Sequence, residues 1–226
     1  MAKGMGIVRQ IPKYGCYALK AVGKKKIFCI GRNKTGTTSL KKALENIGVG
    51  VGHQRPGELL IHDWARGDFR RLFIFCRTAQ AFQDVPFNLP FTYMALDKKY
   101  RESKFILTAR DSSGQWYESL VRSHSKLFGN GNLPDTNDLK NADYCYKGYM
   151  YDVMRLVYGT PDNDPYNKDI LIAHYERYNK NVLDYFRHRE KDLLVLNVSW
   201  KDAYERLHLF LDIPFQDCEF PWENRT

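Results

Sequence analysis

The sequence predicts an α/β protein of three layers, α/β/α, in which helices cover both faces of a mostly parallel central sheet. Two observations lead to this prediction. Short apolar runs, such as those at 27–30 and 104–108, alternate with longer segments whose apolar residues recur at helical spacing. No internal repeat or low-complexity linker interrupts the 226 residues. We therefore expect a single domain over residues 26–226, preceded by an extension at residues 1–25.

The first half of the chain contains the clearest strand and helix signals. The run at 27–30 suits a buried parallel strand, and Leu40, Ala43, Leu44 and Ile47 predict a helix that Gly48 ends. The elements expected next are a short strand at 49–53, helices at 57–66 and 68–80, a strand at 82–85 stopped by Pro86, a helix at 89–100 and a strand at 104–108.

The second half begins with the capping-box spacing Ser112-x-x-Gln115, which predicts the start of a helix. Residues 129–141 are rich in Gly, Asn and Asp and are expected to form a surface loop. The remaining predictions are a Tyr-rich helix at 144–158, a loop at 161–165, a long helix through 175–186, a strand at 193–196 and a final helix capped by Ser199-x-x-Asp202.

Charge and cysteine content limit the function classes. The net charge of +9 suits a nucleotide, a nucleic acid, an acidic glycan or an anionic membrane, and it equally suits a basic surface that only confers solubility. The five cysteines are far apart and form no Cys-x-x-Cys pair, so neither a zinc ribbon nor a disulfide framework is indicated, and a reducing, cytoplasmic setting is expected. We find neither a signal-peptide pattern nor an apolar run long enough to span a bilayer.

Glycines and hydroxyl groups follow the first predicted strand. Ligands of parallel sheets bind beyond the carboxyl ends of the strands, here at 31–38, 84–86 and 108–112. Gly31-x-x-x-x-Gly36 has the spacing of a phosphate-binding loop, whose backbone N–H groups converge on an anion at a helix N-terminus. Lys34 adds a full charge. A threonine-capped helix without a ligand is the alternative interpretation.

The loop departs from the Walker form of ATPases and GTPases. That form places a lysine directly after the second glycine, where this chain has Thr37. The sequence instead contains Lys34-Thr35-Gly36-Thr37-Thr38-Ser39-Leu40, which resembles the 5′-phosphosulfate loop of sulfotransferases that use 3′-phosphoadenosine 5′-phosphosulfate (PAPS).

A second segment resembles the same family. The strand at 104–108 leads into Arg110, and Ser119 follows nine residues later; in the family such an arginine and a serine, more commonly eight residues apart, hold the 3′-phosphate of the donor. Guanidinium binds phosphate in a bidentate fork, so the residue types suit this role. An arginine paired with a neighbouring carboxylate is the alternative.

The resemblance implies a fold like that of P-loop NTPases and a sulfotransferase-like domain over 26–226. It implies transfer of a sulfuryl group from PAPS to a hydroxyl acceptor, a glycan or glycolipid, leaving adenosine 3′,5′-bisphosphate, with no metal and no nucleic acid. The residues expected to bind PAPS are Arg32, Asn33, Lys34, Thr35, Gly36, Thr37, Thr38, Ser39, Arg110 and Ser119.

Lys34, Asp84 and two histidines are candidates for catalysis. Lys34 would neutralise the departing phosphate. Asp84, in Asp84-Val85-Pro86, stands where cytosolic members of the family have a catalytic His-Leu-Pro, so it is the leading general base. His53 and His62 are its rivals, and a capping role in the turn is the alternative for Asp84.

Other residues allow two interpretations each. Trp64 and Trp116 either stack on the donor or belong to the core, and the tyrosines of 144–151 either line an acceptor cleft or pack on a helix face. Two other functions stay open, namely a P-loop small-molecule kinase and a non-catalytic binder of acidic polymers.

Overall fold

The structure, a computed structural model, describes residues 21–215, 220 and 221 and contains a four-stranded sheet. The strands β1 (Ile27–Cys29), β2 (Ala81–Gln83), β3 (Lys104–Thr108) and β4 (Leu193–Leu196) lie in the order β2-β1-β3-β4, and each neighbouring pair is parallel. Most of the expected extension at 1–25 lies outside the described residues. The parallel pairing of the four strands confirms the α/β class and the parallel sheet.

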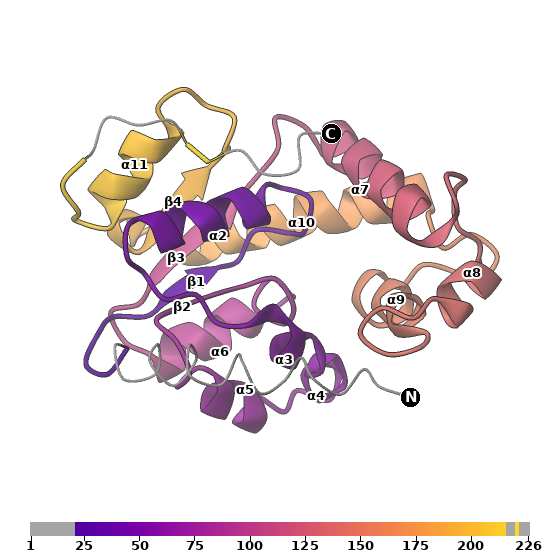
Figure 1. Cartoon of the computed structure of the whole chain (residues 1–226), viewed down its shortest axis with the longest axis horizontal. Helices are drawn as coiled ribbons and strands as arrows, with labels where there is room; N and C mark the ends of the chain where they lie inside the picture. The colour runs from indigo at the N-terminus through magenta and orange to yellow at the C-terminus, as the bar shows by residue number, and fades with distance from the viewer. Residues whose placement is uncertain (1–20, 216–219, 222–226) are drawn as a thin grey trace, which may run out of the picture.

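Both faces of the sheet are covered, as the alternation of side chains in a strand requires. Phe28 and Phe105 belong to a cluster with α5 (Arg70–Phe75), α6 (Thr92–Lys99) and α10 (Lys168–Phe186). Cys29 and Ile106 belong to a cluster on the opposite face, with α2 (Thr37–Asn46) and α11 (Ala203–Phe210). Figure 1 shows α5 and α6 below β1 and β2 and α2 above them; with the two clusters, this confirms the three-layer prediction.

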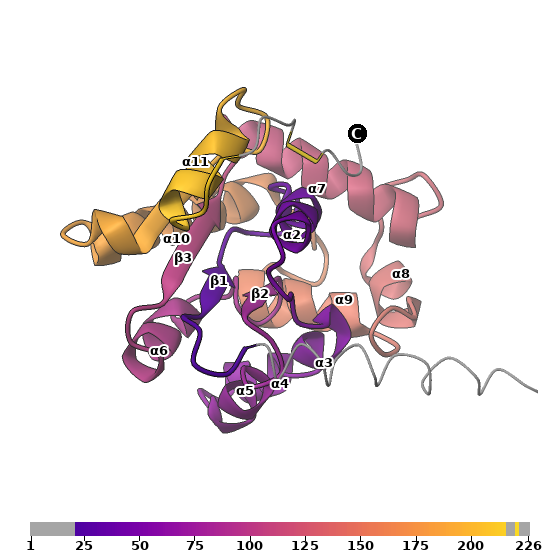
Figure 2. The ribbon, with the colours of Figure 1, turned by 60° about the vertical axis from the view of Figure 1, so that its left-hand side comes forward.

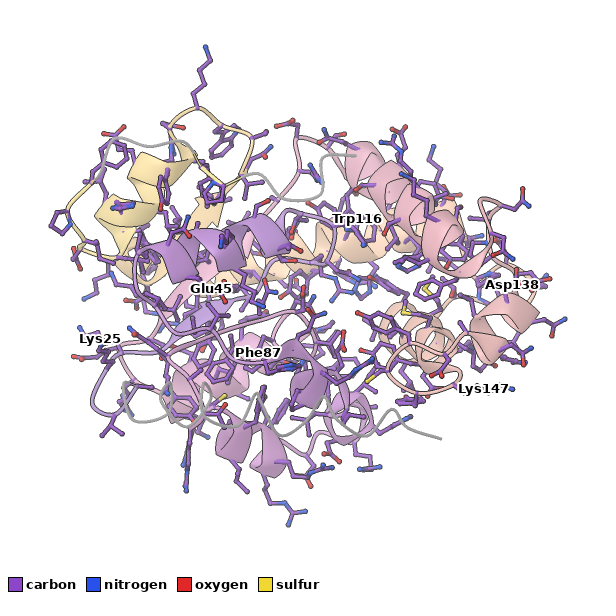
Figure 3. The ribbon with its side chains drawn as sticks, in the orientation of Figure 1. Lys25, Glu45, Phe87, Trp116, Asp138 and Lys147 are labelled. Atoms are coloured by element: carbon purple, nitrogen blue, oxygen red, sulfur yellow. The ribbon has the colours of Figure 1, made fainter. Side chains whose placement is uncertain are left out.

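A third cluster lies to one side of the sheet (Figure 1). It joins α7 (Ser113–Phe128), α8 (Thr136–Asn141), α9 (Tyr149–Asp152) and the π-helix η1 (Val153–Tyr158) to α10. Trp116, labelled in Figure 3, is fully buried there, with its ring stacked on Tyr175 at 4.6 Å between centroids. Trp116 is thus a core residue, the second of its two interpretations.

The segment between β1 and β2 differs most from the prediction. The strand expected at 49–53 is a single bridge between Val51 and Ala81. Its backbone hydrogen bonds to the segment at 80–81 come from Gly50 and Gly52 alone. The helix expected at 57–66 is split into α3 (Gln54–Glu58) and α4 (Ile61–Ala65), and α3 begins early because the His53 side chain accepts from Arg55 N–H. The helix expected at 68–80 ends at Phe75.

Three later predictions are also wrong in part. The loop expected at 129–141 contains α8, whose capping box joins Asp135 and Asp138. The Tyr-rich helix begins only at Tyr149, after an antiparallel bridge between Asp143 and Lys147. Ser199 binds the Asn197 side chain instead of capping the last helix.

By contrast, the strands at 104–108 and 193–196 have the predicted bounds, and the Ser112 hydroxyl caps α7 by accepting from Gln115 N–H at 3.1 Å. A short 3₁₀ helix, η2 (Glu190–Asp192), leads into β4. In the part of the chain that the structure describes, no helix has the length and apolar character needed to cross a membrane.

Candidate active site

The three strand exits singled out in the sequence meet in one cleft of about 470 Å³. Its walls come from the loop after β1, the turn after β2, the segment after β3, and parts of α2, α3, α7 and α9. Figure 2 shows α2 and α7 above α3 and α9, and residues of all four helices line the cleft. Nine predicted site residues line it: Asn33, Lys34, Gly36, Thr37, Thr38, Ser39, Asp84, Arg110 and Ser119.

The loop after β1 is held against the end of β3. At Gly31 a Cβ atom would lie 2.0 Å from the Thr108 hydroxyl oxygen, so no side chain fits there. The buried Thr35 hydroxyl lies 2.6 Å from that of Thr108 and 2.5 Å from the Arg32 carbonyl oxygen. The loop is therefore anchored by its own threonine to the neighbouring strand.

The N-terminus of α2 opens into the cleft without a cap. Its N-cap residue, Gly36, supplies no side chain, no acidic residue occupies the first turn, and Thr37, Thr38 and Ser39 line the cleft. The first N–H groups of a helix need an acceptor and carry the positive end of its dipole. This ten-residue helix therefore presents a site suited to an anion.

Arg110 and Lys34 lie side by side although 76 residues separate them. The Arg110 Nε atom donates to the Lys34 carbonyl oxygen at 2.8 Å, and the Arg110 backbone N–H donates to the Tyr175 hydroxyl at 3.0 Å. Lys34 has a left-handed backbone with φ 68°. Burial lowers the pKa of Lys34, while the nearby Asp84 acts to raise it. Two cations from different strand exits thus line one wall.

Asp84 is a buried carboxylate that lines the cleft. It is 8% exposed, has a left-handed backbone with φ 58°, and its Oδ1 atom has no hydrogen-bond partner in the described structure. Burial raises the pKa of Asp84 to about 6; a hydrogen bond from Thr37 and the charge of Lys34 act to lower it, and the charge of Glu58 acts to raise it. A carboxylate with this pKa can accept a proton near neutral pH.

The comparison with known families agrees with this geometry. The family model described as a sulfotransferase domain matches residues 26–226. The chain belongs to the sulfotransferase family. A search of curated proteins gave no match. The matched range includes all three strand exits, so the cleft is built entirely from the sulfotransferase domain.

Three predicted site residues lie away from the lining of the sulfotransferase cleft. The Arg32 guanidinium is buried between the rings of Tyr158 and Tyr178 and donates to the Asn88 carbonyl oxygen at 2.5 Å. The Thr35 hydroxyl is used to anchor the loop, and His53 caps α3. The side chains of Arg32 and Thr35 therefore stabilise the loop, and a contact with a donor would involve their backbone.

Helix α7 supplies a wall of the sulfotransferase cleft, and Ser119 is the residue of this wall that the sequence predicted. Besides Ser119, it contributes Ser123, His124 and Lys126, which recur on one helical face. His124 is 2% exposed and lies 2.9 Å from the Tyr166 hydroxyl. Burial lowers the pKa of His124 to about 3, with a further lowering from Lys34, so the ring is neutral at physiological pH.

The opposite wall contains aromatic residues and a carboxylate. Tyr144 and Tyr149 line the cleft, whereas Tyr146 and Tyr151 bond to Asp152 and Asp162 away from it. Two of these tyrosines thus line the cleft and two pack elsewhere, and a role in acceptor binding stays a prediction. Glu58, at the end of α3, also lines the cleft and was not anticipated, because its position depends on how α3 packs on the turn after β2.

Replacing Gly36 with alanine should strongly destabilise the protein. Gly36 has φ +94°, and an added Cβ would lie 2.4 Å from the Val198 Cγ2 atom. Left-handed strain and overpacking together cost roughly 2–4 kcal/mol, which urea denaturation would measure. Gly114→Ala is the matched control, because its Cβ meets only the Ser112 hydroxyl at 3.8 Å inside a helix. Equal stability of the two variants would contradict this view of the loop.

Proposed function

We propose that this sulfotransferase uses PAPS as donor and transfers its sulfuryl group to a hydroxyl acceptor. One observation supports the proposal above all. Lys34, the uncapped N-terminus of α2 and Arg110 line a single cleft, and Arg110 Nε lies 2.8 Å from the Lys34 carbonyl oxygen. Two anion-binding groups that meet in this way suit a nucleotide with phosphates at both its 3′ and 5′ positions.

The two ends of the donor are assigned to different strand exits. Lys34, Thr37 and Thr38, with the first N–H groups of α2, would bind the 5′-phosphosulfate. Arg110 and Ser119 would bind the 3′-phosphate. The fit is favourable because α2 has no capping side chain or first-turn carboxylate that would compete with an anion.

Asp84 is proposed as the general base. It would take the proton of the acceptor hydroxyl while that oxygen bonds to sulfur and the bond from sulfur to the phosphate oxygen breaks. Lys34 would offset the charge that develops on the departing phosphate, as in the related phosphoryl transfers. Bound PAPS supplies the activated sulfuryl group, and the protein supplies position and charge.

The histidines are weaker candidates for this role. His124 is the histidine that lines the described cleft, but its pKa of about 3 makes it a poor proton acceptor. His62 is bonded to Tyr146 and Asp152, and His53 caps α3. The Asp84 carboxylate faces the same cleft as Lys34, so it combines the required position with a suitable pKa.

The acceptor that the family resemblance implies is a glycan or glycolipid hydroxyl. Tyr144 and Tyr149 line the cleft, and aromatic faces can stack on a sugar ring. Among the described residues, no three His, Cys, Asp or Glu side chains converge as a metal site would require. The absence of a metal requirement stays a prediction, which a chelator can test.

Calorimetry with adenosine 3′,5′-bisphosphate tests the proposal. We expect tight binding that persists in EDTA and that Lys34→Ala weakens by roughly 10- to 100-fold, the value of a charge-assisted contact. ATP with Mg²⁺ should bind more weakly. The reverse preference, with Mg²⁺-dependent ATP turnover, would support the kinase alternative. Salt-sensitive binding of heparin that is unchanged by Lys34→Ala, without nucleotide binding, would support the polymer binder.

A further inference from the structure

Glu58 is a buried carboxylate in the cleft for which the proposed transfer has no role. It is the last residue of α3, is 5% exposed, and lines the same cleft as Asp84 and Lys34. Burying a charged group is costly unless it is paired or hydrogen-bonded, so its partners indicate what it can still bind.

The packing of α3 places Glu58 beside the proposed base. A Cβ at Gly57 would lie 2.7 Å from the Val85 carbonyl oxygen, so α3 rests directly on the turn that carries Asp84. The two carboxylates are close enough that the charge of Glu58 acts on Asp84. The cleft thus contains two neighbouring carboxylates, Asp84 and Glu58, and Asp84 also lies beside Thr37 and the charge of Lys34.

The two oxygens of Glu58 differ in their contacts. Oε1 accepts from the Gln54 side-chain nitrogen at 2.8 Å and from the Tyr144 hydroxyl at 3.0 Å. Oε2 lies 3.8 Å from an Arg55 terminal nitrogen, beyond hydrogen-bond distance. The Arg55 side chain is 45% exposed, and its guanidinium lies over the Tyr144 ring. Oε1 is therefore fixed by neutral donors, and Oε2 retains most of its capacity to accept.

Bound donor would change the balance of charge in the cleft. A nucleotide with phosphates at both ends would use the charges of Lys34 and Arg110, which leaves Asp84 and Glu58 facing the acceptor. Tyr149, Met150 and Val153 also line the cleft, and beside such largely apolar surface charges interact more strongly than in water. An anionic acceptor would be repelled there, and a cationic one attracted.

We propose that Glu58, held in place by Tyr144, recognises an acceptor that carries a protonated amine as well as its reacting hydroxyl. The ammonium group would donate to Glu58 Oε2, while Asp84 takes the proton of the hydroxyl as sulfur bonds to its oxygen. Tyr144 holds Glu58 in place through Oε1. This inference rests on the proposed function. It narrows the acceptor to hydroxyl compounds that also carry an amine, either aromatic amino alcohols and amino phenols or amino sugars.

Pairs of acceptors that differ in whether they carry a free amine test this proposal. Sulfate transfer from PAPS is measured with tyramine against para-ethylphenol and with glucosamine against N-acetylglucosamine, which separates the aromatic from the sugar source. We expect the wild-type protein to prefer the amine of at least one pair by roughly 10- to 100-fold in kcat/KM, mainly through KM. Glu58→Gln should bring that preference close to one. Tyr144→Phe should keep it, because the charge remains.

The controls separate this inference from the function on which it depends. Affinity for adenosine 3′,5′-bisphosphate should be the same in the wild-type protein, Glu58→Gln and the exposed-site control Glu118→Gln, which shows that the variants fold. Amine binding to the complex with adenosine 3′,5′-bisphosphate, followed by calorimetry, gives a readout that needs no turnover. Failure of the nucleotide to bind would overturn the proposed function. Nucleotide binding without amine preference, or a preference that Glu58→Gln leaves unchanged, would overturn only the role of Glu58.

Discussion

Replacing Asp84 with asparagine should remove nearly all sulfuryl transfer while affinity for adenosine 3′,5′-bisphosphate stays nearly unchanged. The loss expected for a missing general base is ~10²–10⁴-fold in kcat. Nucleotide affinity should persist because the proposed phosphate contacts come from the loop, α2 and Arg110. Single-turnover assays would measure transfer, and calorimetry would measure binding.

The same substitution should make the protein more stable. Burial raises the pKa of Asp84 from 3.8 to about 6, and two pKa units correspond to roughly 3 kcal/mol. Below about pH 4 the group is protonated in both the folded and the unfolded state, so it costs nothing. As the pH rises from about 4 to about 6, the unfolded chain releases its proton first, and folding stability falls. Above that range the full cost remains, and Asp84→Asn removes it.

Urea denaturation at two pH values would measure this effect. The stability gap between Asp84→Asn and the wild-type protein should be larger at pH 8 than at pH 4. Asp84→Ala is a useful contrast, because φ at this position is 58° and asparagine tolerates a left-handed backbone that costs alanine roughly 1–2 kcal/mol. Unimpaired transfer by Asp84→Asn would exclude Asp84 as the base.

The pH profile gives an independent measure of the base. The value of kcat/KM should fall as the pH drops through about 6, where Asp84 becomes protonated. Four groups act on this pKa besides burial, namely Thr37, Glu58, Lys34 and Lys41. Because the charge of Glu58 raises it, Glu58→Gln should move the acidic limb of the profile to lower pH. If substitutions at Asp84 and at Glu58 both left the acidic limb of the profile unchanged, another group would have to be the general base.

The sequence predicted the parts of this site that depend on short segments. A strand followed by Gly31, Lys34 and Gly36 specifies its own loop, and the parallel pairing of β1, β2 and β3 brings their exits together. Local spacing also predicted the start of α7, where Ser112 bonds to Gln115 N–H.

What the sequence could not predict depends on residues far apart along the chain. Arg32 looked like a phosphate ligand, but Tyr158 and Tyr178, which lie 126 and 146 residues further on, enclose its guanidinium. The burial of His124 depends on Tyr166, which lies 42 residues further along the chain. Glu58 acquired its place from the contact of Gly57 with Val85, and no local pattern records that contact.

Replacing Arg110 with methionine should lower the affinity for adenosine 3′,5′-bisphosphate by roughly 10- to 150-fold, the value of one or two charge-assisted hydrogen bonds. Adenosine 5′-monophosphate should lose far less, because it lacks the 3′-phosphate. The ratio of the two affinities, measured by calorimetry, isolates the contact with that phosphate. Ser119→Ala should reduce the same ratio by a smaller factor, since serine supplies a neutral donor.

Arg110 also contacts the loop, and the ratio of the two nucleotide affinities separates this contact from the one with the 3′-phosphate. Its Nε atom donates to the Lys34 carbonyl oxygen at 2.8 Å, so methionine also removes a hydrogen bond that holds Lys34 in its left-handed backbone. Loss of that hydrogen bond should weaken the binding of both nucleotides equally, since both use the loop. Arg110→Lys would supply charge but could not bridge the loop and the phosphate together, because a lysine lacks the guanidinium fork. If Arg110→Met weakened both nucleotides by the same factor, Arg110 would act only through the loop, and the 3′-phosphate would have to bind elsewhere.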